Sequence, residues 1–346
     1  TTPPPPWSAW PLPPAASAGV GVVIVLQLMR LAQCFGRGGT WGGGILMAYE
    51  NVPENKRSFY AAIPQIGLPI GFGLSSILIA VPTLLLPEDI FFTWGWRIPF
   101  LAAIILTLIV IRQKGEMMET EDYKKAQAKL EAEEAEGKKH KVGFIPMVKG
   151  YWKTLLLGCG TRWVDGTFYN IFIVWILSYC INWLGMPLIQ TYIITIIACI
   201  FKIPFTLFGG WCAQKLGNTR TFVIGALASA VLSIPTLKVI ELSKGNLAIT
   251  IIGIVLGWSI AYNLIWAVIS SLWSSYFETE VRYSGISFVY HVPSFLVAGM
   301  VPTICTLLIN YGNGDTIYVG IYSTVVALIS AACALALKAR HDRGEK

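Results

Sequence analysis

Residues 36–100 decide the fold, and they read GRGGTWGGGILMAYENVPENKRSFYAAIPQIGLPIGFGLSSILIAVPTLLLPEDIFFTWGWRIPF. A glycine-rich apolar segment ends at Glu50, a short polar turn carries Lys56 and Arg57, and a second apolar segment follows. Trp96 and Arg97 open a third. Two closely packed bilayer-spanning helices, joined by a charged hairpin and followed by an anchored return, explain this pattern. The sequence therefore predicts an integral membrane protein.

The composition agrees with this prediction. Apolar residues make up 55% of the 346-residue chain and charged residues 13%, against about 45–50% and 25% in soluble domains. A soluble enzyme is excluded. The formal charge of +7 is explained by retention of Lys and Arg on the cytoplasmic side of a membrane, so we expect no nucleic-acid partner.

The cysteines and the motifs indicate no cofactor. All seven cysteines lie in or beside apolar segments, and none forms a C-x-x-C pair: Cys34, Cys159, Cys180, Cys199, Cys212, Cys305 and Cys333. We interpret them as small buried hydrophobic residues, with neither metal nor disulfides. The chain contains no P-loop, HExxH or GxSxG motif, so we expect a protein that is not an enzyme.

The pattern of apolar and polar segments predicts an all-α protein with about nine membrane spans. Residues 1–17 are proline-rich and predict a disordered lead. Residues 18–111 predict three spans, at about 18–49, 58–86 and 96–111, which form the remnant of an N-terminal bundle. Residues 112–150 predict an exposed linker helix rich in Glu, Lys and Ala. Residues 151–340 predict a six-helix bundle with spans at roughly 152–184, 187–213, 220–241, 246–276, 284–310 and 315–338, and 341–346 a tail.

Apart from one mixed turn with Lys238, Lys244 and Glu241, basic residues mark every second connection, which predicts the topology. They occur at Lys56 and Arg57, throughout 112–153, at Lys215 and Arg220, at Arg282 and in the tail. These connections are expected to be cytoplasmic, which places the C-terminus inside and the N-terminus outside a plasma membrane. Twelve-span transporters carry a long linker at their midpoint, whereas this linker follows three spans. We therefore expect a truncated or misread gene product that lacks three helices.

Five short motifs, in order, resemble the major facilitator superfamily and within it the metabolite–proton symporter branch. They are RLAQCFGRGGTWGGG (30–44), ENVPENKR (50–57), WGWRIPF (94–100), GWCAQKLGNTR (210–220) and FETEVRYSG (277–285). The resemblance covers about residues 22–340 and implies helices 4–12 of a twelve-span fold. Gln214 stands where the family's cytoplasmic loop has an acidic residue, and the hallmarks of sugar porters do not occur.

Ionisable residues inside predicted spans are candidates for the site because each costs about 2.5–3.5 kcal/mol in hydrocarbon. Arg162 and Asp165 are three residues apart on one helix face, close enough to pair. Asp165 is either a proton-accepting carboxylate with Arg162 as partner or anion clamp, or half of a structural ion pair. His291 is a candidate proton shuttle; a hydrogen-bonded core histidine is the alternative.

The predicted substrate residues are basic or amphipathic side chains in the spans. Arg30 and Arg37 could hold a substrate carboxylate, although Arg30 could also pack or snorkel. Lys202 lies ~12 Å inside the cytoplasmic end, so we favour a cavity position over snorkelling. An aromatic residue recurs every four positions at Trp258, Tyr262 and Trp266, with Asn263 beside them. This stripe either lines a substrate path or packs on a neighbouring helix. Similar candidates are Tyr169 and Asn170.

The resemblance also implies a cytoplasmic gate. Opposite charges at helix ends can bridge the two halves in one conformation and release in the other. The candidate gate residues are Glu50, Arg57, Glu119, Glu278 and Arg282. Arg97 lies on the outer side and is expected to hydrogen-bond helix-end carbonyls.

The predicted function is secondary active transport by alternating access, with proton-coupled symport of a small organic acid or zwitterionic metabolite. The expected partners are the substrate, protons and the lipid bilayer, and the protein is expected to be monomeric. The alternatives are an inactive truncated fragment and a sugar-type facilitator of the same superfamily. A membrane-embedded enzyme would need clustered His or carboxylate residues at one depth, and Asp165 is nearly alone.

Overall fold

The computed structural model describes Leu28 and residues 44–45, 48–49, 52–53, 56–114 and 144–345. The chain divides into two units, Thr1–Gly43 and Gly44–Lys346, and everything below concerns the second. The predicted proline-rich lead, nearly all of the first span and most of the linker helix lie outside the described residues. So do four candidate site residues: Arg30, Arg37, Glu50 and Glu119.

The described part of the chain is helical. Its helices in the N-terminal part are α4 (Arg57–Ala62), α5 (Gly67–Leu85), α6 (Glu88–Thr93) and α7 (Ile98–Lys114), with 3-10 turns at Pro64–Ile66 and Gly95–Arg97. After residue 143 come α9 (Phe144–Tyr169), α10 (Ile176–Asn182), α11 (Leu188–Leu216), α12 (Asn218–Leu242), α13 (Leu247–Ile254), α14 (Asn263–Ser274), α15 (Thr279–Leu296), α16 (Val301–Tyr311) and α17 (Ile317–Asp342).

Seven segments of the described residues are long and apolar enough to cross a bilayer, which confirms the predicted fold class. They are Arg57–Leu85, Met147–Asn182, Leu188–Leu216, Asn218–Leu242, Leu247–Ser274, Val281–Tyr311 and Ile317–Asp342. A shorter apolar helix covers Gly95–Ile109. These eight segments coincide with eight of the predicted spans. Helices suit this setting because they satisfy their own backbone hydrogen bonds where no water is present.

Several of the spans contain an irregular turn. Two of them continue through a π-helical stretch, Asn170–Trp175 between α9 and α10 and Val255–Ala261 between α13 and α14. A 3-10 turn, Ala298–Met300, joins α15 to α16. A π-helical turn inserts one residue into a helix, and such turns occur often at functional sites.

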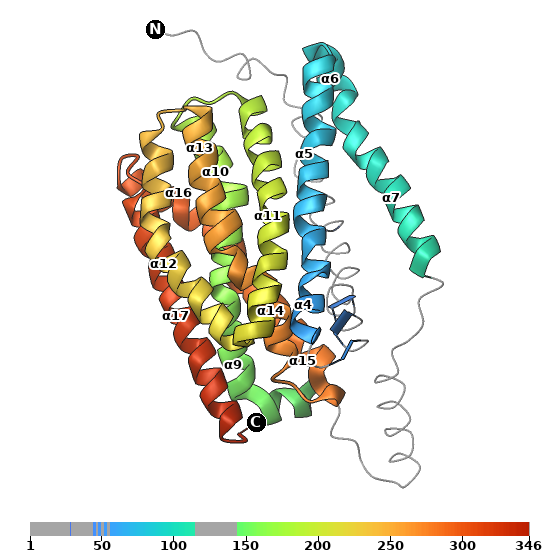
Figure 1. The fold of residues 1–346 in the computed structure, drawn as a ribbon. Helices are drawn as coiled ribbons and strands as arrows, with labels where there is room; N and C mark the ends of the chain where they lie inside the picture. Colours follow the sequence, from blue (N-terminus) through green and yellow to red (C-terminus); the bar gives the residue numbers. More distant parts are fainter. Residues whose placement is uncertain are drawn as a thin grey trace. The chain divides into compact units, whose positions relative to one another are not determined.

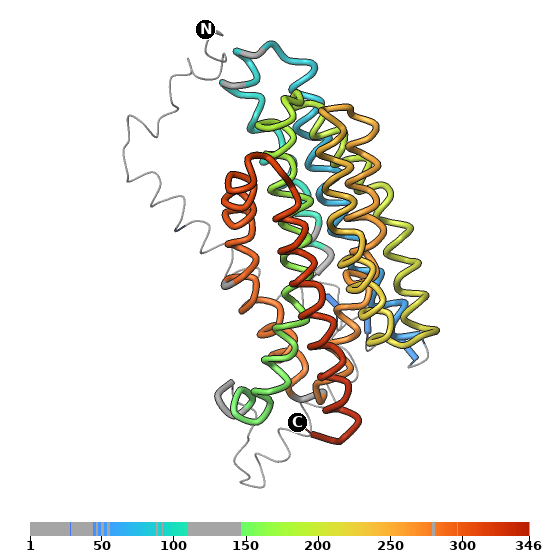
Figure 2. Tube along the Cα trace, turned by 90° about the vertical axis from the view of Figure 1, so that its left-hand side faces the viewer, coloured from blue at the N-terminus to red at the C-terminus, as the bar shows by residue number. Residues whose placement is uncertain are grey.

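Successive spans alternate in direction, so their connections gather at two ends (Figures 1 and 2). One end holds the start of α4, the α11–α12 and α14–α15 connections and the C-terminus (Figure 1), and it carries Lys56, Lys215 and Arg282. We call it the basic end. Gly217 makes the tight α11–α12 turn there with φ +88°, a conformation that glycine adopts without steric cost.

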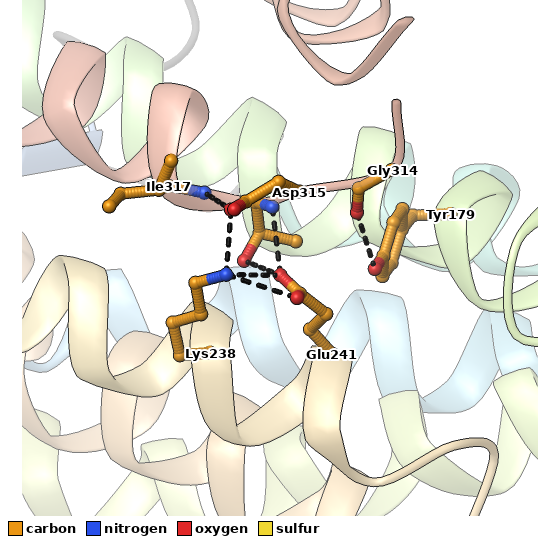
Figure 3. A network of polar contacts seen from close by, with 7 residues as sticks. Tyr179, Lys238, Glu241, Gly314, Asp315 and Ile317 are labelled. Carbon is orange, nitrogen blue, oxygen red and sulfur yellow. Dashed lines mark hydrogen bonds and ion pairs between the residues drawn. The ribbon is translucent and has the colours of Figure 1, made fainter. Parts of the chain in front are cut away.

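A polar network ties α12 to α17 at the opposite end (Figure 3). Lys238 Nζ contacts Glu241 at 3.0 Å and Asp315 at 2.6 Å. Glu241 Oε2 accepts hydrogen bonds from the Thr316 backbone N–H and hydroxyl, at 2.8 and 2.7 Å. The Ile317 N–H donates to Asp315 Oδ1 at 2.7 Å. Every carboxylate in this network therefore has more than one donor.

Candidate substrate and proton site

A buried ion pair lies in the middle of the span that begins with α9. Arg162 and Asp165 form this pair one turn apart, and their side chains are 8% and 1% exposed. Within the described residues, they and Lys202 are the charged residues that are more than nine-tenths buried. The predicted pairing on one helix face therefore occurs, and it lies inside the protein.

Side chains from two other helices complete the surroundings of this pair. The Tyr262 hydroxyl, just before α14, donates a hydrogen bond to Asp165 Oδ1. From α15, Ser294 Oγ accepts a hydrogen bond of 3.3 Å from Arg162 Nη2, and the Tyr290 ring lies 4.3 Å from the guanidinium carbon. The ion pair thus joins three spans, since each partner of the pair is held by a different helix.

Lys202, on α11, contacts the ring of Tyr262, whose hydroxyl bonds Asp165. Its residue exposure is 0%, and its Nζ lies 4.4 Å from the Trp258 ring centroid and 4.3 Å from that of Tyr262. Both distances are within the range of cation–π attraction. Lys202 therefore does not snorkel: its side chain lies in the interior between two aromatic rings, and its placement in a substrate cavity stays a prediction.

The backbone around Lys202 is held in place. The Asn263 Nδ2 and the Thr206 hydroxyl both donate to the Lys202 carbonyl, at 2.8 and 2.9 Å. Asn263 and Thr206 also bond to each other. Asn263 follows Tyr262 in the sequence, but its side-chain amide bonds to α11 and not to the ion pair.

The predicted aromatic stripe divides into two roles. Trp258 and Tyr262 form the faces that enclose Lys202, and Tyr262 also bonds Asp165. Trp266 instead donates its Nε1–H to the Gln65 carbonyl at 3.0 Å, so it connects α14 to the turn before α5. The π-helical stretch ends at Ala261, and the Tyr262 N–H bonds the Gly257 carbonyl five residues back. This wider turn interrupts the α-helical periodicity that would place Trp258, Tyr262 and Trp266 on one helix face.

Tyr169, Asn170 and His291 lie at the edges of the site. The Tyr169 ring meets Phe72 of α5 edge-on at 5.8 Å, and Asn170 Nδ2 donates to the Gly166 carbonyl of its own helix at 2.8 Å. The half-buried His291 contacts the Tyr290 ring edge-on at 5.1 Å. His291 therefore lies next to the ring that covers Arg162.

The basic end brings together two predicted gate residues on a ring that the sequence analysis missed. Arg57 lies 5.3 Å from the ring centroid of Tyr49, and Arg282 lies 5.8 Å from it. Arg57 Nε donates to the Val52 carbonyl, and Arg282 Nε to that of Phe277. The exposed Glu278 is the N-cap residue of α15. Tyr49 thus contacts one arginine that precedes the linker (112–150) in the sequence and one that follows it.

Three further contributors were missed: Gln65, Tyr290 and Ser294. No motif in the sequence marks these three residues, because each acts through a partner that is distant in sequence. Tyr290 and Ser294 are four residues apart, so they share one helix face, and this spacing is a signal that could have been found beside His291. The bond to Gln65 uses a backbone carbonyl, which no sequence pattern reports.

A bundle of apolar spans with charged residues buried near the middle of the spans is typical of a multi-pass membrane transporter. The chain belongs to the Major Facilitator Superfamily, whose pattern it matches over residues 8–302. It is a multi-pass protein of the plasma membrane.

Its relatives are transporters of small molecules. The chain is 28% identical to the shikimate transporter of Escherichia coli strain K12 over 94% of its own length and 73% of that protein. It is 30% identical to an inner membrane metabolite transport protein of the same strain, over 96% of its length and 74% of the relative. It is 26% identical to the proline/betaine transporter of Salmonella typhimurium strain LT2, over 96% and 66%.

The fold is also found in a solved structure. A D-xylose–proton symporter superimposes with a TM-score of 0.58 over 85% of this chain and 65% of its own, at 16% sequence identity. At this level of identity the likeness establishes the fold alone.

Proposed function

We propose that this chain is a secondary active transporter that couples proton entry to uptake of a small organic acid or zwitterionic metabolite by alternating access. The observation that carries the proposal is the buried Asp165 carboxylate, held by Arg162 and Tyr262. An ionisable residue at mid-depth is costly and is a candidate for the proton pathway of a transporter. Named relatives that carry shikimate or proline and betaine support both substrate classes.

The contacts of Asp165 explain how a proton could control the site. In the ionised state the carboxylate neutralises Arg162 and accepts the Tyr262 hydroxyl. Protonation removes the charge that holds Arg162, which leaves the guanidinium donors that do not bond Ser294 available to a substrate. Proton binding and substrate binding would then favour the same state, which is what coupling requires. The transport cycle forms no covalent bond and needs no cofactor.

Alternating access requires a contact that opens and closes, and the basic end supplies one. Trp266 Nε1 donates to the Gln65 carbonyl at 3.0 Å, and the Ser270 hydroxyl to the Ala61 carbonyl at 3.3 Å. These bonds join α14 to the segment from α4 to α5. Since both use backbone carbonyls of the N-terminal part, they can break without leaving a charge unpaired.

The test is uptake driven by a pH gradient in proteoliposomes, with labelled shikimate and labelled proline as probes. Asp165→Asn keeps the size of the side chain but cannot exchange a proton. We expect it to lose at least about ten-fold of the accumulation driven by an acidic exterior, because the proton no longer contributes free energy. Exchange of internal for external substrate, which needs no net proton movement, should continue.

Two variants serve as controls for this experiment. Asp165→Glu retains a titratable carboxylate and should retain coupling. Asp89→Asn changes an exposed carboxylate of α6 and should behave as wild type. Unchanged pH-driven accumulation in Asp165→Asn would leave the pair as a structural ion pair and remove the basis of the proton-coupling role. Absence of both uptake and exchange in the wild type would favour the inactive fragment.

A further inference from the structure

Two buried hydrogen-bond donors beside the ion pair have no acceptor. Lys202 Nζ and Trp258 Nε1 are both inaccessible to solvent, and neither has a hydrogen-bond partner within the part of the chain that the structure describes. They belong to residues in direct contact, with Nζ 4.4 Å from the Trp258 ring centroid. Buried donors normally have acceptors, and an orphaned one requires an explanation. Two such donors in one place indicate an acceptor that arrives with a ligand.

The charges of the site have the same implication. Among the described residues, the buried charged side chains are two cations, Arg162 and Lys202, and one carboxylate, Asp165. Asp165 is already paired with Arg162. Lys202 therefore remains as a buried basic side chain that contacts two aromatic faces and no carboxylate of the described residues. A buried cation without a counter-ion destabilises the protein unless an anion compensates it.

We propose that Lys202 and Trp258 bind a carboxylate group of the transported molecule, and that the substrate is an organic anion and not a zwitterion. This inference rests on the proposed function, because it names the substrate class for the same site. The Lys202 ammonium and the Trp258 indole N–H donate to the two oxygens of the carboxylate. The substrate charge then neutralises the Lys202 ammonium, for which the described residues provide no counter-ion.

The aromatic rings give a reason for the exclusion of a zwitterion such as betaine. A quaternary ammonium group is recognised by aromatic faces, and the two faces here, Trp258 and Tyr262, are occupied by the protein's own Lys202. A second cation at this place would meet like charge. The rings that could form a cage for an ammonium ligand therefore favour the opposite sign of substrate.

Helix α5 packs on α11 one turn before Lys202. The position of a Cβ on Gly73 of α5 lies 3.4 Å from Cys199 Cβ, on the turn of α11 that precedes Lys202. The adjacent Phe72 of α5 meets Tyr169, the last residue of α9. The lysine is fully buried when α5 is packed on α11, so separation of these two helices is the motion that would admit the substrate.

The experiment measures equilibrium binding of labelled ligands to the purified protein in lipid nanodiscs. Shikimate and succinate are the anionic probes, and proline and glycine betaine are the zwitterionic probes. We expect saturable binding of at least one anion and none of either zwitterion. Lys202→Met should weaken anion binding about ten- to hundred-fold, because a hydrogen bond to a charged group is lost. Trp258→Phe keeps the ring but removes the N–H, and should weaken it about two- to ten-fold.

Folding of the variants is checked by the melting temperature. Lys202→Met is expected to melt at a higher temperature than wild type, because it removes a buried ammonium without a hydrogen-bond acceptor. Weaker anion binding together with higher stability separates a ligand role from a structural one. Lys202→Arg keeps the positive charge and should retain the preference for anions. Trp258→Phe tests the same donor pair independently if the lysine variants do not fold.

The outcomes distinguish this inference from the proposed function. Binding of betaine or proline in preference to every anion, or full anion affinity in Lys202→Met, overturns the inference while pH-driven uptake still supports proton coupling. Binding of an anion that depends on Lys202, together with uptake that ignores the pH gradient, supports the inference and overturns the coupling. Absence of binding of any anion also overturns the inference.

Discussion

At the scale of single residues, the charged groups of the chain differ in how fully they are paired. In the network of Figure 3, Lys238 contacts two carboxylates, and Asp315 accepts from both Lys238 and the Ile317 N–H. Lys202 has aromatic contacts but no hydrogen-bond acceptor among the described residues. The first arrangement stabilises the ends of α12 and α17, whereas the second costs stability and is expected where a ligand completes the site.

Asp315 gives the network a pH dependence. The Lys238 ammonium and the Ile317 N–H both stabilise the ionised carboxylate, so the pKa of Asp315 lies below its ordinary value. A carboxyl group with a lowered pKa in the folded state stabilises the protein at pH values above its unfolded pKa, and this contribution disappears as the pH falls through the folded pKa. The stabilisation is therefore present at neutral pH and is lost in acid.

We expect Asp315→Asn to lower the melting temperature at pH 7 and to have a smaller effect as the pH approaches 3. The measurement is thermal unfolding of the detergent-solubilised protein across this pH range. Asp89→Asn, at an exposed carboxylate for which no comparable network is present, serves as the control and should follow wild type. A constant difference between wild type and Asp315→Asn at all pH values would contradict this explanation.

At the scale of elements, close packing at the basic end depends on small residues where α4 crosses α11. A Cβ added to Gly210 would lie 2.7 Å from the Ala62 Cβ and 3.4 Å from the Phe59 backbone. On the neighbouring position, a Cβ at Gly209 would lie 2.6 Å from the Ala267 Cβ of α14. Small residues allow helix backbones to approach in a bilayer, and here two consecutive glycines serve two different partners.

Gly210→Leu should prevent the closure of the basic end, because the larger side chain cannot fit against α4. We expect uptake to fall at least ten-fold, since a contact of this kind stabilises one of the two states that must alternate. Ala61 is fully buried in wild type. A cysteine in its place should be alkylated faster when it is combined with Gly210→Leu than when Gly210 is retained. Labelled peptides identified by mass spectrometry report this site separately from the native cysteines.

Gly150→Leu is the matched control, because a Cβ at this glycine of α9 meets no described atom within 4 Å. It should leave both uptake and alkylation close to wild type. Equal transport by the two leucine variants would show that the α4–α11 contact does not have to close during the cycle.

At the scale of the whole molecule, the distribution of basic residues and the alternation of the spans agree. The basic end gathers the connections that carry Lys56, Lys215 and Arg282. Asp89 of α6 and Asp315 of the α16–α17 connection lie at the opposite end, where Lys238 is paired with Glu241 and Asp315. If positive charge stays on the cytoplasmic side, the basic end faces the cytoplasm.

A topology experiment tests this orientation. Green fluorescent protein fused after Lys346 should fluoresce, because it folds in the cytoplasm, whereas alkaline phosphatase fused at the same position should be inactive. Alkaline phosphatase inserted after Asn313, in the α16–α17 connection, should be active. The reverse result at both positions would invert the molecule and place the Arg57–Arg282 contact outside the cell.

Local patterns predicted much of the fold and a part of the site. The seven described spans and the shorter apolar helix could be predicted because a bilayer requires long apolar segments. The Arg162–Asp165 pair could be predicted because three-residue spacing fixes a shared face. The bond from Tyr262 to Asp165 could not, because it joins residues 97 positions apart. Trp266 was grouped with Trp258 by spacing alone, and its bond to Gln65 separates the two.

Hydrophobicity along the chain is enough to predict a membrane protein of many helices whose successive spans alternate in direction, and five short motifs are enough for the resemblance to a superfamily of transporters. These are local features, which need no knowledge of which helices touch. The placement of Lys202 between Trp258 and Tyr262, and the bond from Tyr262 to Asp165, come from the tertiary structure. Packing between distant helices fixes these contacts, and in hydrocarbon many packings satisfy the same apolar pattern.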